Sequence, residues 1–282
     1  MEIGKLYNRF KEELTKVYPP GEATAICNMV FEHAGFSKTS LLSKKKDEPE
    51  EAMQIKMTAW LEQLKKQVPV QYVLKHAWFY NLKLNVGPAV LIPRPETEEL
   101  VKYALEFLKQ VKNPAVLDIG TGSGCIAVAV KKNNAGSIVT AIDVSSGALT
   151  IAKENAAAHE VIIDFRELDF LDTENRKQLK QFDCIVSNPP YIPLGEAALL
   201  DKNVTAFEPH HALFVPDDQP LIFYEAIAAF AKTHLKDNGK VFLETHENLA
   251  EKVAAHFLKN GFIADVQKDI FGKQRFVFAA LQ

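Results

Sequence analysis

The chain begins with three stretches in which apolar residues recur at three- and four-residue steps, the spacing of an amphipathic helix. They cover residues 3–17, about 22–33 and 53–64, and the first is stopped by Pro19-Pro20. The Met and Trp residues of the third stretch fit this stripe as core residues. The pattern predicts a small all-helical N-terminal domain over residues 1–67.

The amino-acid composition changes after Pro69. Residues 70–86, VQYVLKHAWFYNLKLNV, are rich in aromatic and β-branched side chains and have a polar break at Asn81. This composition predicts a β-hairpin. We expect it to lie in a linker, residues 68–96, between two domains.

From residue 97 to residue 282, helical and strand patterns alternate. Helices are expected at 97–110, 124–132, 146–158, 220–235 and 247–259, and strands at 115–119, 137–143, 161–165, 182–187 and 240–245. Two further strands after Phe262 would close one edge. Alternation of this kind implies parallel pairing. The predicted fold class is α/β, with a doubly wound, mainly parallel sheet.

The net charge of the chain argues against a protein whose main function is to bind nucleic acid. The 282 residues carry a formal net charge of -3, whereas neutralising phosphates needs a basic surplus. Residues 1–90 hold 13 Lys and Arg against 10 Asp and Glu, and the remainder holds 20 against 26. We therefore expect no direct nucleic-acid partner. The mildly basic front part could face an acidic partner, but we interpret it first as a solvated surface.

Three widely spaced cysteines, Cys27, Cys125 and Cys184, suggest neither a disulfide framework nor a zinc knuckle. The first residues lack the apolar core of a signal peptide, and no window approaches the apolar length of a membrane span. We expect a soluble, cytoplasmic protein without a membrane partner.

A glycine-rich turn follows the strand at 115–119. Gly120-Thr121-Gly122-Ser123-Gly124 lets the backbone turn tightly and approach a ligand, and the next helix presents free amide donors. Cys125 stands where a dinucleotide fingerprint needs its third glycine, which disfavours NAD. Asp143, at the end of the next strand, could accept the hydroxyls of a ribose. A nucleoside ligand without a pyrophosphate is predicted.

Two more strand ends carry candidate side chains. Asp169-Phe170 could receive an adenine amino group and stack on the base, and a surface Asp beside a core Phe is the alternative. Asn188-Pro189-Pro190-Tyr191 follows the strand at 182–187. The Asn188 carbonyl and a proline carbonyl could hold both hydrogens of a planar amide or amine, while Tyr191 packs against the planar group and its nitrogen faces an electrophile.

Together, these motifs resemble those of class I S-adenosylmethionine-dependent methyltransferases that act on planar nitrogens, which have a Rossmann-like fold. The segments IPRPETE (92–98), LDIGTGSGCIA (117–127), SNPPYIP (187–193) and VTAFEPHHALF (204–214), with the helical N-terminal part, resemble the release factor glutamine methyltransferases (the HemK or PrmC family). This similarity covers nearly the whole chain.

The resemblance implies N5-methylation of the glutamine in the GGQ motif of peptide chain release factors. It implies that S-adenosylmethionine, without a metal, is held by the glycine turn, Asp143, Asp169, Phe170 and Asn188. It assigns the glutamine amide to residues 188–191, and docking of the release factor to the helical domain. Arg94 and Glu96 would lie at the interdomain edge, either acting directly or as an ion pair with helix capping.

The sequence departs from the family at four places. Lys75 and Asn81 stand where members often have glycine, and residues 215–221 replace a more glycine-rich loop. Residues 245–249 lack the glycine often seen after the preceding strand, and Leu249 replaces the glutamine. His210-His211 has no third ligand at metal-binding spacing. Two rival functions stay open: an N-methyltransferase acting on an exocyclic amine of a nucleic-acid base, and a non-enzymatic module that binds a nucleoside cofactor.

Overall fold

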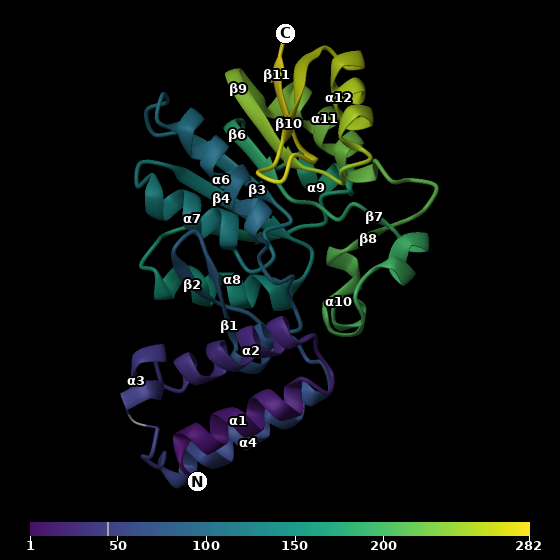
Figure 1. Cartoon of the computed structure of the whole chain (residues 1–282). Helices are drawn as coiled ribbons and strands as arrows, with labels where there is room; N and C mark the ends of the chain where they lie inside the picture. The colour runs from purple at the N-terminus through teal and green to yellow at the C-terminus, as the bar shows by residue number, and fades with distance from the viewer. Residues whose placement is uncertain (44) are drawn as a thin grey trace. The chain divides into compact units, whose positions relative to one another are not determined.

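The computed structural model describes residues 1–43 and 45–282 (Figure 1). The chain folds into two compact units. The first consists of Met1–His76 and Asp201–Phe207, and the second of Ala77–Leu200 and Glu208–Gln282. The functional site described below lies entirely in the second unit.

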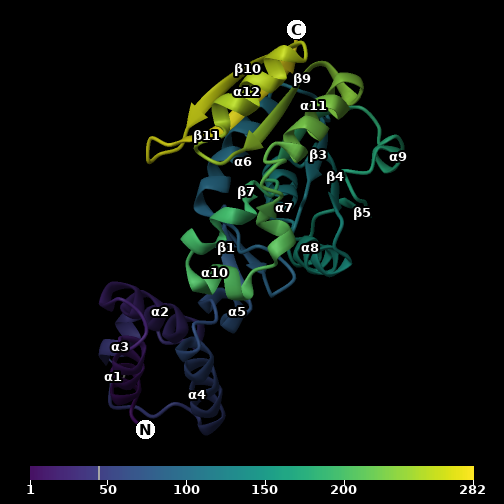
Figure 2. The same cartoon turned by 90° about the vertical axis from the view of Figure 1, so that its right-hand side faces the viewer.

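The first unit is helical (Figure 2). Its helices are α1 (Ile3–Leu14), α2 (Pro20–His33), α3 (Lys38–Ser43), α4 (Glu51–Lys65), α5 (Val70–Leu74) and, from the later segment, α10 (Lys202–Phe207). Ile3, Leu6, Phe10 and Leu14 of the predicted stripe are buried, whereas Val17 lies beyond the end of α1 and is exposed. The rings of Tyr7 and Phe10 meet Phe31 of α2 edge to face, with ring centroids 5.1 and 5.4 Å apart. Met57 and Trp60 of α4 join this core, as expected.

Residues 70–74 correct the sequence prediction. They were expected to begin the hairpin, but they form α5, with Pro69 at its N-cap. Val70, Tyr72, Val73 and Leu74 are all buried. The β-branched and aromatic residues of this segment favour a strand, but that preference depends mainly on how the side chains pack. Here the side chains are buried as a short helix, and this packing decides the conformation.

The hairpin is shorter than predicted, with β1 (His76–Phe79) and β2 (Leu82–Asn85). Tyr80 and Asn81 between them have φ of 49° and 61°, as a two-residue hairpin turn requires. Lys75 also has φ of 61°. Left-handed backbone at Lys75 and Asn81 explains why glycine suits both positions, and asparagine tolerates this conformation better than lysine.

A seven-stranded sheet forms the second unit, in the order β10-β11-β9-β6-β3-β4-β5. The strands β5, β4, β3, β6 and β9 pair in parallel, and β11 pairs antiparallel with β9 and β10. Their bounds are β3 (Ala115–Ile119), β4 (Ile138–Asp143), β5 (Asp164–Glu167), β6 (Phe182–Ser187), β9 (Leu235–Glu244), β10 (Phe262–Lys268) and β11 (Gln274–Leu281). The predicted doubly wound, mainly parallel sheet is confirmed.

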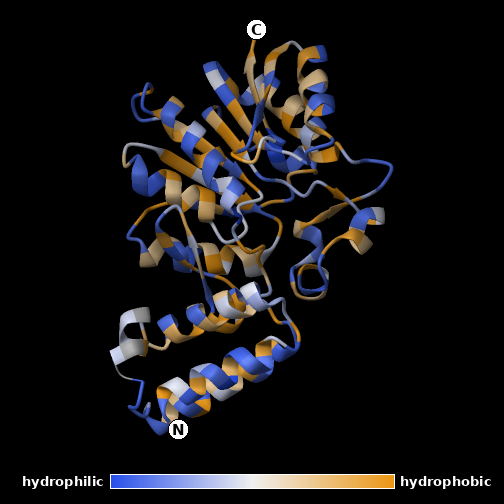
Figure 3. Cartoon of the chain, in the orientation of Figure 1, coloured by the Kyte–Doolittle hydropathy of each residue, from blue (hydrophilic) through white to orange (hydrophobic). Residues whose placement is uncertain are grey.

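Helices cover both faces of this sheet. On one face, α11 (Ile222–His234) and α12 (Ala250–Lys259) pack against Leu117 and Ile119 of β3. On the other, α6 (Pro95–Leu108), α7 (Cys125–Asn133) and α8 (Ser146–Ala158) join Val116 in a second core cluster. The central strands accordingly consist largely of hydrophobic residues, coloured orange in Figure 3.

Edge strand β5 begins three residues later than predicted. Its pairing with β4 starts at Asp164, opposite Thr140, and Ile162 is 88% exposed. The apolar run at 161–163 therefore lies before the ladder, because pairing with β4 sets where the strand begins.

Short elements that the sequence did not predict follow β6 and β5. They are α9 (Thr173–Arg176), β7 (Ile192–Pro193), the 3₁₀ helices η1 (Leu194–Leu199) and η2 (His210–Ala212), and β8 (Phe214–Val215). Strand β7 pairs in parallel with β8, at Ile192 opposite Phe214. This pairing, with a hydrogen bond from the Ile192 amide to the Leu213 carbonyl, brings residues 213–215 beside the segment that follows Asn188.

Candidate active site

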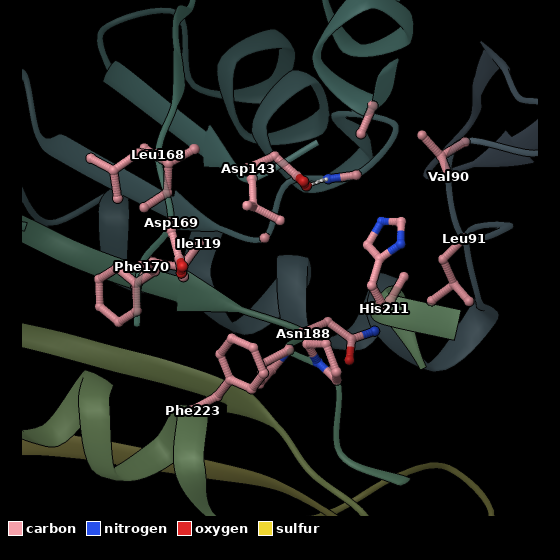
Figure 4. Close-up of a pocket in the computed structure, with 18 of the residues that line it drawn as sticks. Val90, Leu91, Ile119, Asp143, Leu168, Asp169, Phe170, Asn188, His211 and Phe223 are labelled. Atoms are coloured by element: carbon pink, nitrogen blue, oxygen red, sulfur yellow. Dashed lines mark hydrogen bonds between the residues drawn. The ribbon is translucent and has the colours of Figure 1, made fainter. Parts of the chain in front are cut away.

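A pocket opens at the carboxyl ends of β3, β4 and β6 and beside the segment after β5, where open α/β sheets bind ligands (Figure 4). It has a volume of about 770 Å³, including space open to solvent. Most of the predicted site residues line it: Gly120, Gly122, Asp143, Asp169, Phe170, Asn188, Pro189 and Pro190. The structure thus brings together residues spread over about 70 positions of the sequence.

The glycine turn forms one wall. Gly120, Gly122 and Gly124 have φ of 71°, 55° and 78°, in the left-handed region that side chains rarely adopt. A Cβ at Gly124 would also meet Cβ of Ala152 in α8 at 3.1 Å. The turn therefore needs its glycines for backbone conformation and, at the third, for close packing of α7 and α8.

Asp118 supports this turn from below, and sequence reasoning missed it. Its Oδ2 accepts hydrogen bonds from Thr121 Oγ1 at 2.6 Å and from the Ala127 amide at 3.2 Å. Complete burial raises the pKa of its carboxyl to about 7. An acidic residue inside the buried run AVLDI is the signal that could have identified it.

Thr121 and Ser123 do not line the pocket. The Thr121 hydroxyl is engaged by Asp118, and Ser123 is buried, with its hydroxyl lacking a partner among the described residues. The Ser123 carbonyl accepts a hydrogen bond from Asn155 Nδ2 at 2.8 Å. These two residues therefore help to hold the conformation of the glycine turn on the side that faces away from the pocket.

Asp143 lies at the end of β4, facing the turn. Its Oδ2 accepts from the Gly122 amide at 2.8 Å, the contact drawn in Figure 4, and its Oδ1 accepts from the Ser145 amide at 2.9 Å. A carboxylate oxygen can accept two hydrogen bonds. One acceptor position therefore remains on each oxygen, enough for the two hydroxyls of a ribose.

Asp169 and Phe170 line the pocket in different ways. Asp169 is exposed, and its Oδ1 caps the Leu171 amide at 2.9 Å. Phe170 is 5% exposed and packs edge to face on Phe230, with the Arg176 guanidinium 5.1 Å from its ring. Little of the Phe170 ring is accessible to a base, so it serves chiefly as an apolar part of the wall.

Asn188 is the first residue after β6. Its Nδ2 donates to Thr97 Oγ1 at 3.0 Å, and the pocket is lined by Asn188 itself and by the two prolines that follow. Tyr191 does not line the pocket. Its hydroxyl donates to Glu244 Oε1 at 3.3 Å, and burial raises the pKa of this phenol.

Residues of two other loops also border the pocket. Ala89–Leu91 and the segment His211–Ala212 contribute, and His211 is an exposed ring beside the cavity. The loops are tied together by Glu208, which accepts from the Ile92 amide at 3.0 Å and from Arg94 at 2.6 Å. The ion pair of Arg94 is thus with Glu208 and not with Glu96, which lies in the first turn of α6.

The residues present fit a nucleoside that carries a positive charge. Carboxylates stand at the ends of β4 and after β5, and Ile119, Ile142 and Leu168 supply apolar walls. The pocket-lining part of the chain contains no lysine or arginine that could bind a pyrophosphate. Among the described ranges, no three His, Cys, Asp or Glu side chains are grouped to hold a metal ion.

Within residues 1–43 and 45–282, every helix is too short or too polar to cross a lipid bilayer.

Known proteins resemble this chain in sequence and in fold. Residues 100–203 match the family model described as the methyltransferase small domain. Release factor glutamine methyltransferase of Flavobacterium psychrophilum is 44% identical over 230 residues, covering 79% of this chain and 80% of that protein. The protein of the same name from Streptococcus pneumoniae is 37% identical over 279 residues, covering 98% of both chains.

One solved structure shows the shared fold. The 16S rRNA N2 G1207 methyltransferase of T. thermophilus, solved with AdoMet and guanosine, aligns with a TM-score of 0.55 at 19% identity. The alignment covers 73% of this chain and 50% of that one.

Proposed function

Because this chain belongs to the family of release factor glutamine methyltransferases, we propose that it methylates the side-chain nitrogen, N5, of the glutamine in the GGQ motif of peptide chain release factors. The observation that carries the proposal is the position of Asn188. Among the residues that the structure describes, no hydrogen bond engages its side-chain oxygen, which can therefore face a pocket that also contains the glycine turn and Asp143. An amide acceptor beside a nucleoside site suits methylation of a planar nitrogen.

S-adenosylmethionine is the methyl donor, and when bound it supplies an electrophilic methyl group on its sulfonium and leaves as S-adenosylhomocysteine. We assign the ribose hydroxyls to the free acceptor positions of Asp143. We assign Asp169 as the acceptor for the adenine amino group, and the buried ring of Phe170 as an apolar part of the same wall. The glycine turn leaves room for the backbone to approach the amino-acid part.

Asn188 and Pro189 hold the acceptor amide. A glutamine amide nitrogen is a poor nucleophile, because its lone pair is delocalised into the carbonyl. Asn188 Oδ1 and the Pro189 carbonyl can each accept one N–H of the amide, which fixes the lone pair along the line of attack. These hydrogen bonds strengthen as the nitrogen gains positive charge, so they stabilise the transition state more than the bound substrate.

The methyl transfer needs neither a metal nor a covalent enzyme intermediate. As the new C–N bond forms, the nitrogen carries one hydrogen too many, and it releases this proton to solvent. No side chain is required to take the proton before the transfer, because the positive charge appears on nitrogen only as the bond forms. Tyr191 supports the loop from outside the pocket through its hydrogen bond to Glu244.

The N-terminal helices, in this proposal, help to dock the release factor. Residues 1–90 carry the small basic surplus of the chain, 13 Lys and Arg against 10 Asp and Glu. We place the reaction in the cytoplasm, where release factors act on ribosomes. The free cysteines Cys27, Cys125 and Cys184 are compatible with a reducing compartment.

The test is transfer of labelled methyl from S-adenosylmethionine to a purified release factor. We expect label on the intact factor and none on the same factor with its GGQ glutamine replaced, because the glutamine nitrogen is the only acceptor proposed. Label on RNA or DNA instead would keep the nitrogen-methylating site and overturn the substrate. Absence of label from all three would overturn the function.

A further inference from the structure

A chain of hydrogen bonds leads from Asn188 away from the pocket. Asn188 Nδ2 donates to Thr97 Oγ1 at 3.0 Å, and Thr97 Oγ1 donates to Glu244 Oε2 at 2.7 Å. Ser187 of β6 pairs with Leu243 of β9, so Asn188 and Glu244 reach the edge of the sheet side by side. The first turn of α6 places Thr97 between them.

The direction of each hydrogen bond in this chain is determined by chemistry. A threonine hydroxyl has one hydrogen, and an ionised carboxylate can only accept. While Glu244 is ionised, Thr97 must therefore give its hydrogen to Glu244 and can only accept from Asn188. Accepting from Asn188 selects the NH₂ end of the side-chain amide, which turns the Asn188 oxygen toward the pocket.

We infer that Thr97 and Glu244 are positioning residues that fix which end of the Asn188 amide faces the substrate. The inference rests on the proposed function. In the opposite orientation, the Asn188 NH₂ group would face the NH₂ group of the glutamine, and two donors would oppose each other. A weak rotamer preference alone would not exclude this state, because the two ends of an amide have nearly the same shape.

Burial makes the selection effective. Thr97 is 2% exposed and Glu244 is 1% exposed, so water cannot readily replace either partner. Glu244 is itself held from two sides: Tyr191 donates to Oε1 at 3.3 Å, and Tyr224 donates to the Glu244 backbone carbonyl at 3.0 Å. Unpaired polar groups in such surroundings carry a large desolvation cost, which favours the fully bonded arrangement.

Thr97→Val tests the inference, since valine keeps the shape of threonine and removes the hydroxyl. We expect kcat to fall by about 10- to 100-fold, because the acceptor is no longer held in one orientation. The dissociation constant for S-adenosylmethionine should stay near the wild-type value. Thr97→Ser, which restores a hydroxyl, should recover most of kcat. Thr140→Val, at another buried threonine in β4, is the matched control and should leave kcat unchanged.

The outcomes separate positioning from a structural role. A lower melting temperature with wild-type kcat at 20 °C in Thr97→Val would mean that Thr97 only ties α6 to β9, and would overturn the inference. Low kcat in both Thr97→Val and Thr97→Ser would also overturn it, because the hydroxyl would not be the operative group. Absence of methyl transfer by the wild-type enzyme would instead defeat the proposed function.

The same geometry predicts a pH dependence of kcat. Burial raises the pKa of Glu244 to about 7. Below that pH the carboxyl gains a proton and can donate to Thr97, which then frees the Thr97 hydrogen for the Asn188 oxygen. We expect kcat at saturating S-adenosylmethionine to fall as pH drops below about 7. The ionisable groups that act on Glu244 are Glu96, Cys125, Tyr191, Tyr224 and Arg275.

Glu244→Gln tests whether titration of Glu244 causes the fall in kcat at low pH. Glutamine cannot titrate, so we expect kcat to lose its fall at low pH. Because its side-chain amide can turn either an oxygen or an NH₂ group toward Thr97, we also expect a lower kcat at neutral pH. Acid unfolding would not mimic this effect. Because the pKa of Glu244 is higher in the folded state than in the unfolded state, its contribution to the free energy of unfolding is largest at low pH and falls as pH rises from about 4.5 to about 7. An unchanged fall in kcat at low pH in Glu244→Gln would contradict the prediction.

Discussion

Replacing Asn188 by alanine should lower kcat by roughly 10²–10³-fold, the usual cost of removing one group that stabilises developing charge in a transition state. The dissociation constant for S-adenosylmethionine should change little, because the glycine turn and Asp143 remain. The physical reason is that the glutamine nitrogen loses an acceptor that grows stronger as the C–N bond forms. Single-turnover methyl transfer at saturating concentrations of both substrates measures this step directly.

A control is available at Asn175, which lies in α9 and hydrogen-bonds Asp172 at 3.2 Å outside the pocket. Asn175→Ala should transfer methyl at the wild-type rate. If Asn188→Ala did so as well, Asn188 would play no part in holding the amide. A large loss of cofactor affinity in Asn188→Ala would instead make it a binding residue and shift the amide clamp elsewhere.

Local motifs were sufficient to predict most of the candidate residues that line this pocket. The glycine turn, Asp143 and Asn188 each lie at or just after the end of a strand that the hydrophobic pattern identifies, and parallel strands bring their carboxyl ends to one edge. For that reason the doubly wound sheet and the pocket at its edge follow from the sequence. Whether each side chain faces the pocket does not, as Tyr191 and Phe170 show: both are held mainly by neighbours outside it.

The supporting residues could not be predicted, because their partners are remote in sequence. The hydrogen bonds of Thr97 join it to Asn188 and Glu244 across 91 and 147 residues. Arg94 meets Glu208 across 114 residues, whereas the nearby Glu96 looked equally suitable from the sequence. Charge and spacing identify candidates for such pairs, but only the packing of α6 against the sheet and loops selects among them.

The segment at 70–74 was mispredicted for a related reason. Its residue types favour a strand, and no periodicity separates a short buried helix from a short buried strand. The turn at Tyr80-Asn81 was predicted because a polar break between two apolar runs is a local signal. The sequence therefore predicted the turn, which depends on neighbouring residues, but not the helix at 70–74, which depends on burial against the rest of the fold.

Asp143→Ala should weaken binding of S-adenosylmethionine by about 1.5–3 kcal/mol, roughly 10- to 150-fold in dissociation constant, if its hydrogen bonds to the ribose are charge-assisted. The carboxylate also accepts from the Gly122 and Ser145 amides, so its loss leaves two backbone donors without this partner and loosens the turn. Isothermal titration calorimetry with S-adenosylmethionine measures the change.

Asp143→Asn should give a smaller loss, because asparagine keeps one acceptor oxygen, and Asp265→Ala, at an exposed carboxylate on β10, should bind normally. At saturating S-adenosylmethionine, Asp143→Ala should recover most of kcat, since the groups around the glutamine amide remain in place. An unaltered dissociation constant would remove Asp143 from the cofactor site. Together with the result expected for Asn188→Ala, this outcome would assign tightness of methyl-donor binding to the end of β4 and the rate of methyl transfer to the end of β6.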